Sequence, residues 1–224
     1  MQSAKAKMWL MLVIGVVAIG LALFLSAGTI RYWQAWIYLA VGALTSVLLT
    51  LYVMKDPLLL ERRTKAGPSA EQRPVQKLIF TCLAVVWIGM FVVPGLDHRY
   101  SWSSVPSWIS IGGNLLVAVS MWMVYRVFKV NSFGSATVEV SAGQTVISTG
   151  PYAIVRNPMY SGAVVYFVGV SLALGSWWAL IPSFLMALGF VWRLFDEESF
   201  LAQNLPGYKE YCAKVRWHLI PGVF

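Results

Sequence analysis

A stretch of 35 residues, from Pro158 to Trp192, contains no Asp, Glu, Lys, Arg or His. A bilayer core about 30 Å thick takes roughly 20 apolar residues as one helix, so this stretch is too long for a single crossing. Residues 175–178, Gly-Ser-Trp-Trp, interrupt it near the middle. We therefore predict a tight helical hairpin, with Pro182 near the start of its second arm.

Four further apolar windows of membrane-spanning length precede this hairpin, at about 8–25, 33–54, 78–94 and 105–127. Hydrophobic residues make up 58% of the 224 residues and charged residues only 12%. A soluble domain of this size cannot bury that much apolar surface. The sequence thus predicts an all-α fold, a polytopic integral membrane bundle of about six transmembrane helices.

Polar segments divide the chain. Residues 55–77 separate an N-terminal two-helix unit with its loop, residues 1–77, from a core of residues 78–224. Residues 129–158 form a glycine-rich loop longer than most connections in compact domains, which makes it the place where we expect chemistry. The C-terminal segment after residue 200 is too short and too broken by Pro206 and Gly207 to cross the membrane again.

The basic side chains give an independent prediction of topology, because an even number of crossings returns both termini to one face. Only Arg31 and Arg99 are assigned to the opposite face. The positive-inside rule therefore predicts that both termini are cytoplasmic. The basic residues assigned to the face of the termini are Lys5, Lys7, Lys55, Arg62, Arg63, Lys65, Arg73, Lys77, Arg126, Lys129, Arg156, Arg193, Lys209, Lys214 and Arg216.

The net charge of +8 is interpreted as an orientation signal and an attraction for anionic membrane lipids. The basic residues lie beside crossings and form no single stripe, so we expect no nucleic-acid partner. Cys82 lies within a predicted helix and Cys212 in the tail, which implies no disulfide framework. We predict no metal site, and the sequence leaves the oligomeric state open.

Two polar clusters flank the hairpin at the predicted cytoplasmic face. The first is the segment 150–162, with Arg156, Asn157 and Tyr160. These residues also have ordinary interpretations: Arg156 as an arginine that reaches the head groups, Asn157 as a helix cap and Tyr160 as an interfacial aromatic. The second is the acidic run 196–198 after Arg193, which also fits a solvated helix face with an Arg193–Glu197 pair.

Taken together, segments 150–162 and 197–221 resemble, in order and spacing, the paired motifs of the isoprenylcysteine carboxyl methyltransferases and their bacterial relatives. That superfamily also includes phospholipid methyltransferases. The resemblance covers about residues 125–224, whereas residues 1–77 match mainly in hydropathy, with only a weak echo at Asp56, Pro57 and residues 61–63. The family's first motif reads Arg, His, Pro, any, Tyr, any, Gly, and Asn157 replaces its histidine here.

The resemblance implies a methyltransferase that uses S-adenosylmethionine, in what we expect to be a bacterial inner membrane. It implies that Glu198 faces the cofactor pocket, although adjacent helical positions point about 100° apart and Glu197 is an alternative. Arg156 and Arg216 are candidate clamps for an acceptor carboxylate, with Arg193 as an outside candidate. Arg156, Glu198 and Arg216 are thus the candidate catalytic residues. The candidate cofactor-binding residues are Gln144, Val146, Gly150, Tyr152, Asn157, Tyr160, Gly162, Glu197, Tyr208 and Tyr211.

The leading hypothesis is methylation of a lipophilic small molecule or lipidated substrate, in its sharpest form carboxyl O-methylation of an isoprenylcysteine-like acceptor. A phospholipid or another lipid is the alternative within the class. A small transporter or structural membrane protein, and a membrane reductase, are alternatives from other classes; no ionisable residue lies deep in a crossing, which disfavours transport. We expect a lateral opening between the fourth, fifth and sixth crossings, lined by Met121, Met123, Phe128, Phe167 or Trp192.

Overall fold

The computed structural model describes residues 2–64, 74–132 and 144–224, and within these ranges all regular structure is helical. The predicted all-α fold is confirmed. The helices are α1 (Gln2–Ala27), α2 (Trp33–Val53), α3 (Pro57–Thr64), α4 (Pro74–Tyr100), α5 (Ser107–Val130), the 3-10 turn η1 (Gly150–Ala153), α6 (Pro158–Ala173), α7 (Leu180–Asn204) and α8 (Tyr208–Lys214).

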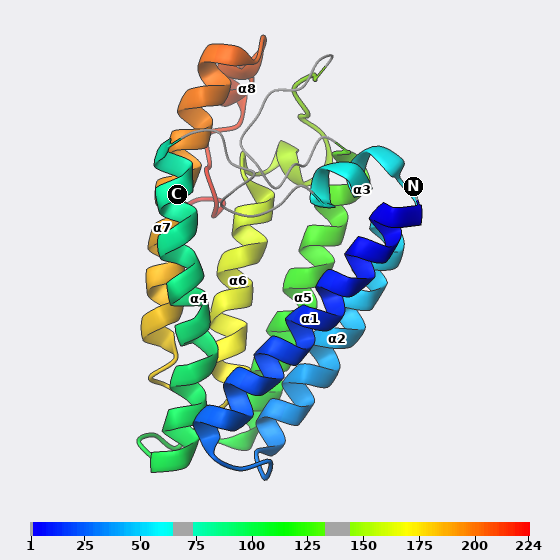
Figure 1. Ribbon diagram of the computed structural model, residues 1–224. Helices are drawn as coiled ribbons and strands as arrows, with labels where there is room; N and C mark the ends of the chain where they lie inside the picture. Colours follow the sequence, from blue (N-terminus) through cyan, green and yellow to red (C-terminus); the bar gives the residue numbers. More distant parts are fainter. Residues whose placement is uncertain (1, 65–73, 133–143) are drawn as a thin grey trace.

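Four of these helices, α1, α2, α4 and α5, are long and apolar enough to cross a membrane. The 35-residue stretch forms two antiparallel arms, α6 and the first part of α7, joined by a turn around Gly175 (Figure 1). Helix α6 is apolar but shorter than the four spans. Helix α7 continues well beyond the apolar stretch, so the polar cluster 193–198 lies on a helix.

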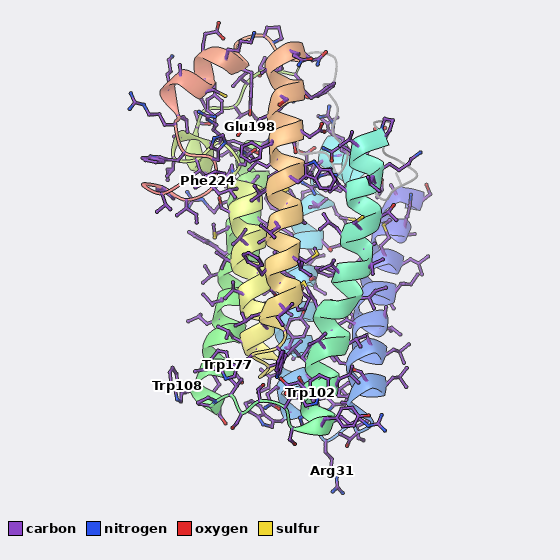
Figure 2. The ribbon with its side chains drawn as sticks, turned by 90° about the vertical axis from the view of Figure 1, so that its left-hand side faces the viewer. Arg31, Trp102, Trp108, Trp177, Glu198 and Phe224 are labelled. Atoms are coloured by element: carbon purple, nitrogen blue, oxygen red, sulfur yellow. The ribbon has the colours of Figure 1, made fainter. Side chains whose placement is uncertain are left out.

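The two ends of the bundle differ in character. Both termini lie at the same end, together with α3, η1 and α8 (Figure 1). The opposite end carries the exposed side chains of Arg31, Trp102, Trp108 and Trp177 (Figure 2). Exposed tryptophans are typical of the boundary between hydrocarbon and head groups. The end that carries the termini is called the terminal end below.

Glycines bring helices into close contact at the tryptophan-bearing end. A Cβ atom at Gly95 of α4 would lie 1.9 Å from the Ser26 Oγ and 2.8 Å from the Leu23 carbonyl oxygen of α1. One at Gly113 of α5 would lie 2.2 Å from the backbone nitrogen of Ala173. Small residues allow membrane helices to approach in this way. From the Gly95 contact, α1 and α4 diverge towards the terminal end (Figure 1).

Candidate functional site

A cavity of about 960 Å³ opens in the terminal half of the bundle. Its polar wall comes from η1, the start of α6 and the middle of α7. Its apolar wall comes from the membrane helices α1, α2, α4, α5, α6 and α7. The cavity therefore joins a charged end to a hydrocarbon-like groove. The polar lining includes Arg63, Asn131, Gln144, Tyr152, Arg156, Asn157, Tyr160, Arg193, Glu197, Tyr208 and Tyr211.

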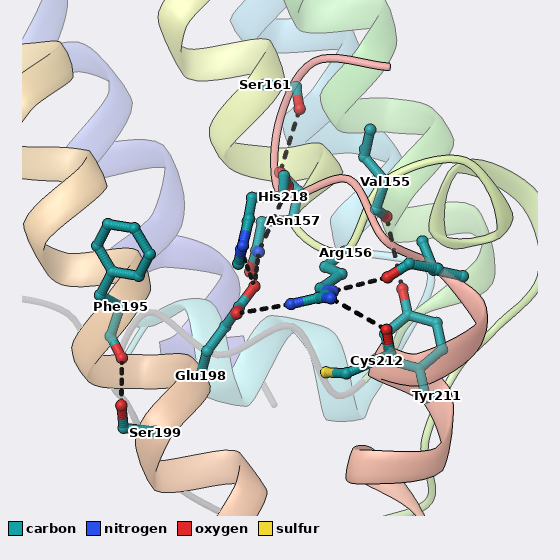
Figure 3. A network of polar contacts seen from close by, with 11 residues as sticks. Val155, Arg156, Asn157, Ser161, Phe195, Glu198, Ser199, Tyr211, Cys212 and His218 are labelled. Carbon is teal, nitrogen blue, oxygen red and sulfur yellow. Dashed lines mark hydrogen bonds and ion pairs between the residues drawn. The ribbon is translucent and has the colours of Figure 1, made fainter. Parts of the chain in front are cut away.

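Arg156 connects the two polar clusters that flank the hairpin. Its Nη1 lies 3.3 Å from the Glu198 Oε2, although 42 positions separate the two residues (Figure 3). Its Nε donates to the Val215 carbonyl oxygen at 2.7 Å and its Nη2 to the Cys212 carbonyl oxygen at 3.0 Å. The guanidinium thus links the C-terminal tail to the start of α6. Its three nitrogens each donate a hydrogen bond within the protein.

Glu198 is the centre of this contact network. Its Oε1 accepts a hydrogen bond from the Asn157 amide at 2.6 Å and lies 3.0 Å from the His218 Nδ1 (Figure 3). The backbone N–H groups of Arg156 and Asn157 donate to the carbonyl oxygens of Trp217 and His218. Asn157 holds the N-cap position of α6, but its side chain makes no capping hydrogen bond. Glu198 does not line the cavity.

The neighbouring glutamate, Glu197, does line the cavity. Its Oε2 accepts a hydrogen bond from the Tyr160 hydroxyl at 2.5 Å, and the Arg193 Nε donates to the same hydroxyl at 3.2 Å. A helical step of about 100° separates the directions of adjacent side chains, which explains why only one of the two acids faces the cavity. Of the two alternatives that the sequence leaves open, Glu197 is therefore the one that lines the cavity.

Three tyrosines close the polar end. The Tyr211 hydroxyl donates to the Tyr152 carbonyl oxygen at 2.8 Å, and the Asn131 amide donates to the Tyr152 hydroxyl at 2.7 Å. Burial raises the pKa of Tyr152 to about 12 and also raises the pKa values of Tyr208 and Tyr211. All three phenols are therefore neutral near pH 7. Their aromatic rings are suited to a cation or a heterocyclic base.

The remaining predicted residues divide into two groups. Gln144, Val146 and Gly162 line the cavity, whereas Gly150 does not. Arg216 is exposed and lies outside the lining, so the structure offers no support for it as a clamp. Part of the predicted loop, residues 133–143, lies outside the described residues.

Of the residues expected at the lateral opening, only some line the cavity. Met121 and Phe167 line the cavity, but Met123, Phe128 and Trp192 do not. Helices α1 and α4 supply much of the apolar wall because they diverge towards the terminal end (Figure 1). The sequence analysis had assigned this wall to later crossings.

Arg63 on α3 lines the cavity but is not among the residues that the sequence predicts for the site. Its Nη2 lies 3.2 Å from the Met159 Sδ, and its guanidinium carbon lies 4.3 Å from the centre of the Phe128 ring. The sequence gives only one signal for it, the weak similarity to the family at residues 61–63. Arg63 is otherwise one of the basic residues that predict the topology.

Comparison with known families gives one match. Residues 108–206, which include most of α5, all of α6 and all of α7, match the family model described as phospholipid methyltransferase. This segment of the protein is therefore similar to the isoprenylcysteine and phospholipid methyltransferase superfamily. No curated protein matches the chain significantly.

The match indicates a membrane methyltransferase that acts on lipid-type substrates, and the usual methyl donor of such enzymes is S-adenosylmethionine. The matched segment carries Arg156, Asn157, Glu197 and Glu198. Helices α1 and α3, which also line the cavity, lie outside it. The matched segment thus shares its cavity with residues from the N-terminal helices.

Proposed function

We propose that the protein transfers a methyl group from S-adenosylmethionine to a lipophilic acceptor, in its sharpest form to the carboxylate of an isoprenylcysteine-like acid. The observation that carries the proposal is the cavity itself, whose charged end continues into an apolar groove between membrane helices. A polar cofactor and a hydrocarbon chain require these two environments side by side.

The residues present fit the cofactor. The Glu197 carboxylate suits its ammonium group, and the amides of Gln144 and Asn157 suit its amino-acid end. Tyr152 and Tyr208 present aromatic surface for the adenine and for the sulfonium. The volume of about 960 Å³ lies at the upper end of the range of about 300–1,000 Å³ typical of ligand sites. S-adenosylmethionine supplies an electrophilic methyl group on positively charged sulfur.

The reaction requires little acid–base catalysis from the protein. A carboxylate acceptor is ionised near neutral pH. One of its oxygens forms a bond to the methyl carbon while the sulfur–carbon bond breaks and leaves its electron pair on sulfur. The products are a methyl ester and S-adenosylhomocysteine, and no proton moves. The protein therefore acts by aligning the two reactants and by excluding water from the carboxylate.

Arg156 and Glu198 serve as positioning residues in this proposal. Their contact fixes the tail segment 212–218 against the start of α6. The tail in turn places Tyr208 and Tyr211 on the cavity wall. Glu197 is the acid that reaches the cofactor.

Methylation of a phospholipid amine is the second candidate, since the matching family model is that of phospholipid methyltransferases. An amine must lose a proton before it attacks a methyl group. Glu197 is the carboxylate on the cavity wall that is placed to accept that proton.

Purified full-length protein in detergent tests the proposal in two steps. Isothermal titration should show binding of S-adenosylmethionine and none of reduced nicotinamide nucleotides; the reverse result would indicate a reductase. Labelled S-adenosylmethionine should then transfer its methyl group to a member of a panel of prenylated cysteines, fatty acids and aminophospholipids. Transfer to prenylated cysteine supports the sharp form, transfer to the aminophospholipid supports the second candidate, and absence of cofactor binding refutes both.

A further inference from the structure

We infer that the N-terminal helices build the acceptor site: Arg63 binds the carboxylate of a single-chain amphiphile, and the cleft between α1 and α4 holds its hydrocarbon chain. The inference rests on the proposed function and names the substrate class of the same cavity. It assigns a role to residues that lie outside the segment matched by the family model.

Arg63 is a cation whose direct side-chain contacts are apolar. Its contacts are the Met159 sulfur and the face of the Phe128 ring, and it forms no ion pair with a described residue. Its Nε is buried and has no hydrogen-bond partner among the described residues. Burial lowers the pKa of Arg63 to about 10, so the guanidinium remains charged near pH 7. The field of the Glu197 carboxylate offsets part of the cost of burying this charge, and a ligand carboxylate in direct contact with the guanidinium would offset more of it.

The position of Arg63 is fixed by its helix. Asp56 caps α3, because its Oδ1 accepts hydrogen bonds from the backbone N–H groups of Leu58 and Leu59. At the other end, the Lys7 Nζ of α1 donates to the Thr64 carbonyl oxygen at 2.8 Å. Leu59 and Leu60 are buried against the bundle. Helix α3 is thus anchored at both ends, and Arg63 is held at the rim of the cavity.

The cleft beside Arg63 runs down the apolar wall. Helices α1 and α4 touch at Gly95 and separate towards the terminal end (Figure 1). Both helices contribute cavity-lining side chains along the separated part. These are Met8, Met11 and Leu12 on α1 and Phe80, Leu83 and Ala84 on α4. Met11 and Ala84 are exposed in the protein as well as lining the cavity, so the cleft reaches the surface that faces lipid.

The dimensions favour one chain. A cavity of about 960 Å³ must hold both the cofactor and the reacting part of the acceptor, which leaves little room for two hydrocarbon chains. Flexible methionines such as Met8 and Met11 adapt to chains of different shape. A guanidinium fork pairs with a carboxylate through two parallel hydrogen bonds. These features together point to a long-chain or prenylated acid.

The test measures binding of two acids and their neutral counterparts to the full-length protein in detergent. The probes are palmitic acid and N-acetyl-S-farnesylcysteine, each compared with its primary amide. Arg63→Gln should raise the Kd of the acids at least tenfold and leave the Kd values of the amides and of S-adenosylmethionine within twofold. The matched control is Arg62→Gln, since Arg62 is the adjacent arginine and does not line the cavity.

A second pair of variants tests the cleft. Ala84→Trp should weaken binding of acids and amides alike, at least tenfold, because it fills the groove. Val85→Trp is its control, since Val85 is exposed and lies outside the lining. Both variants must bind S-adenosylmethionine as the unmodified protein does, which shows that they are folded.

Four results would overturn the inference: Arg63→Gln binds the acids normally, Arg63→Gln loses S-adenosylmethionine instead, neither acid binds, or phosphatidylethanolamine binds with the same dependence on Arg63. Failure of the proposed function is a separate result, because it would appear as absence of cofactor binding in the unmodified protein. The acid and amide titrations are performed without cofactor, so their outcome is independent of that result.

Discussion

Two adjacent glutamates on α7 have different surroundings, and this difference can be measured. Glu197 lines the cavity with the Tyr160 hydroxyl bound to it. Glu197→Gln removes the charge that would hold the cofactor's ammonium, an interaction of about 1.5–3 kcal/mol. We expect the Kd for S-adenosylmethionine, measured by isothermal titration, to rise about tenfold or more. Glu210→Gln, on the exposed face of α8, is the control, and an unchanged Kd in Glu197→Gln would refute this role.

Replacement of Glu198 is expected to lower the stability of the folded protein. Its side chain is only 11% exposed and contacts Arg156, Asn157 and His218. Glu198→Gln weakens these contacts, at a cost of about 1–3 kcal/mol. The midpoint of thermal unfolding should fall by roughly 2–10 °C. Trypsin should also cleave the tail near Lys214 and Arg216 faster.

The control for Glu198 is its neighbour. Glu197→Gln should affect tail cleavage less, because the hydrogen bond from the Tyr160 hydroxyl ties Glu197 to α6. Equal protection of the tail in Glu198→Gln and the unmodified protein would contradict the network shown in Figure 3.

At the scale of single residues, the sequence indicates a site residue only where the type of side chain is unusual for its position. Arg156 and Glu197 stand out because charged side chains border an apolar stretch. Arg63 does not stand out, because it lies among other loop charges and 96 positions separate it from Met159. Arg216 has the residue type expected of a carboxylate clamp, but it is exposed and lies outside the cavity lining. Residue type carries no information about side-chain direction. Contacts across such distances in sequence are set by packing, which a single sequence does not display.

The helices themselves were predictable from hydropathy, with one instructive difference. The third apolar window was expected to end at Pro94, but α4 continues through Pro94 to Tyr100. Proline is tolerated within membrane helices because neighbouring groups satisfy the freed carbonyl. Asp97, which follows it, is buried and accepts hydrogen bonds from the Ser103 backbone N–H and from the hydroxyls of Ser103 and Ser176. Polar contacts at the end of the bundle thus extend the helix beyond its apolar window.

The Gly95 contact determines how α1 and α4 diverge. Gly95→Ala places a Cβ atom in contact with Ser26 and with the Leu23 backbone, so the two helices must move apart. We expect a loss of about 1–3 kcal/mol, the usual cost of overpacking. Thermal unfolding in detergent measures it. Gly42→Ala is the control, because nothing lies within 4 Å of its added Cβ atom, and it should be neutral or slightly stabilising. Equal stability of the two variants would show that the contact is not needed.

For the molecule as a whole, the cavity unites parts of the chain with different sequence signals. The matched segment 108–206 supplies most of the polar wall, and the N-terminal helices supply much of the apolar wall. Hydropathy predicted both sets of helices but not their shared cavity, because general apolarity does not specify which helix faces which. This division explains why the sequence predicts the lateral opening at the later crossings and not at α1 and α4.

Topology is the prediction that belongs to the whole molecule. Both termini lie at one end of the bundle, and nearly all basic residues were assigned to that face (Figure 1). The positive-inside rule predicts that this end faces the cytoplasm. The test uses single cysteines at two exposed positions in a background with Cys82→Ser and Cys212→Ser: Ser101→Cys at the tryptophan-bearing end and Lys209→Cys on α8.

A membrane-impermeant maleimide applied to intact cells should label Ser101→Cys, whereas Lys209→Cys should react only after the membrane is permeabilised. Labelling of Lys209→Cys in intact cells would invert the topology. An inverted protein would expose Glu197 and the tyrosine-lined end of the cavity to the outside, away from the cytoplasmic supply of S-adenosylmethionine. The same measurement therefore bears on orientation and on the proposed chemistry, because a cofactor made in the cytoplasm can reach this cavity only if the terminal end faces inward.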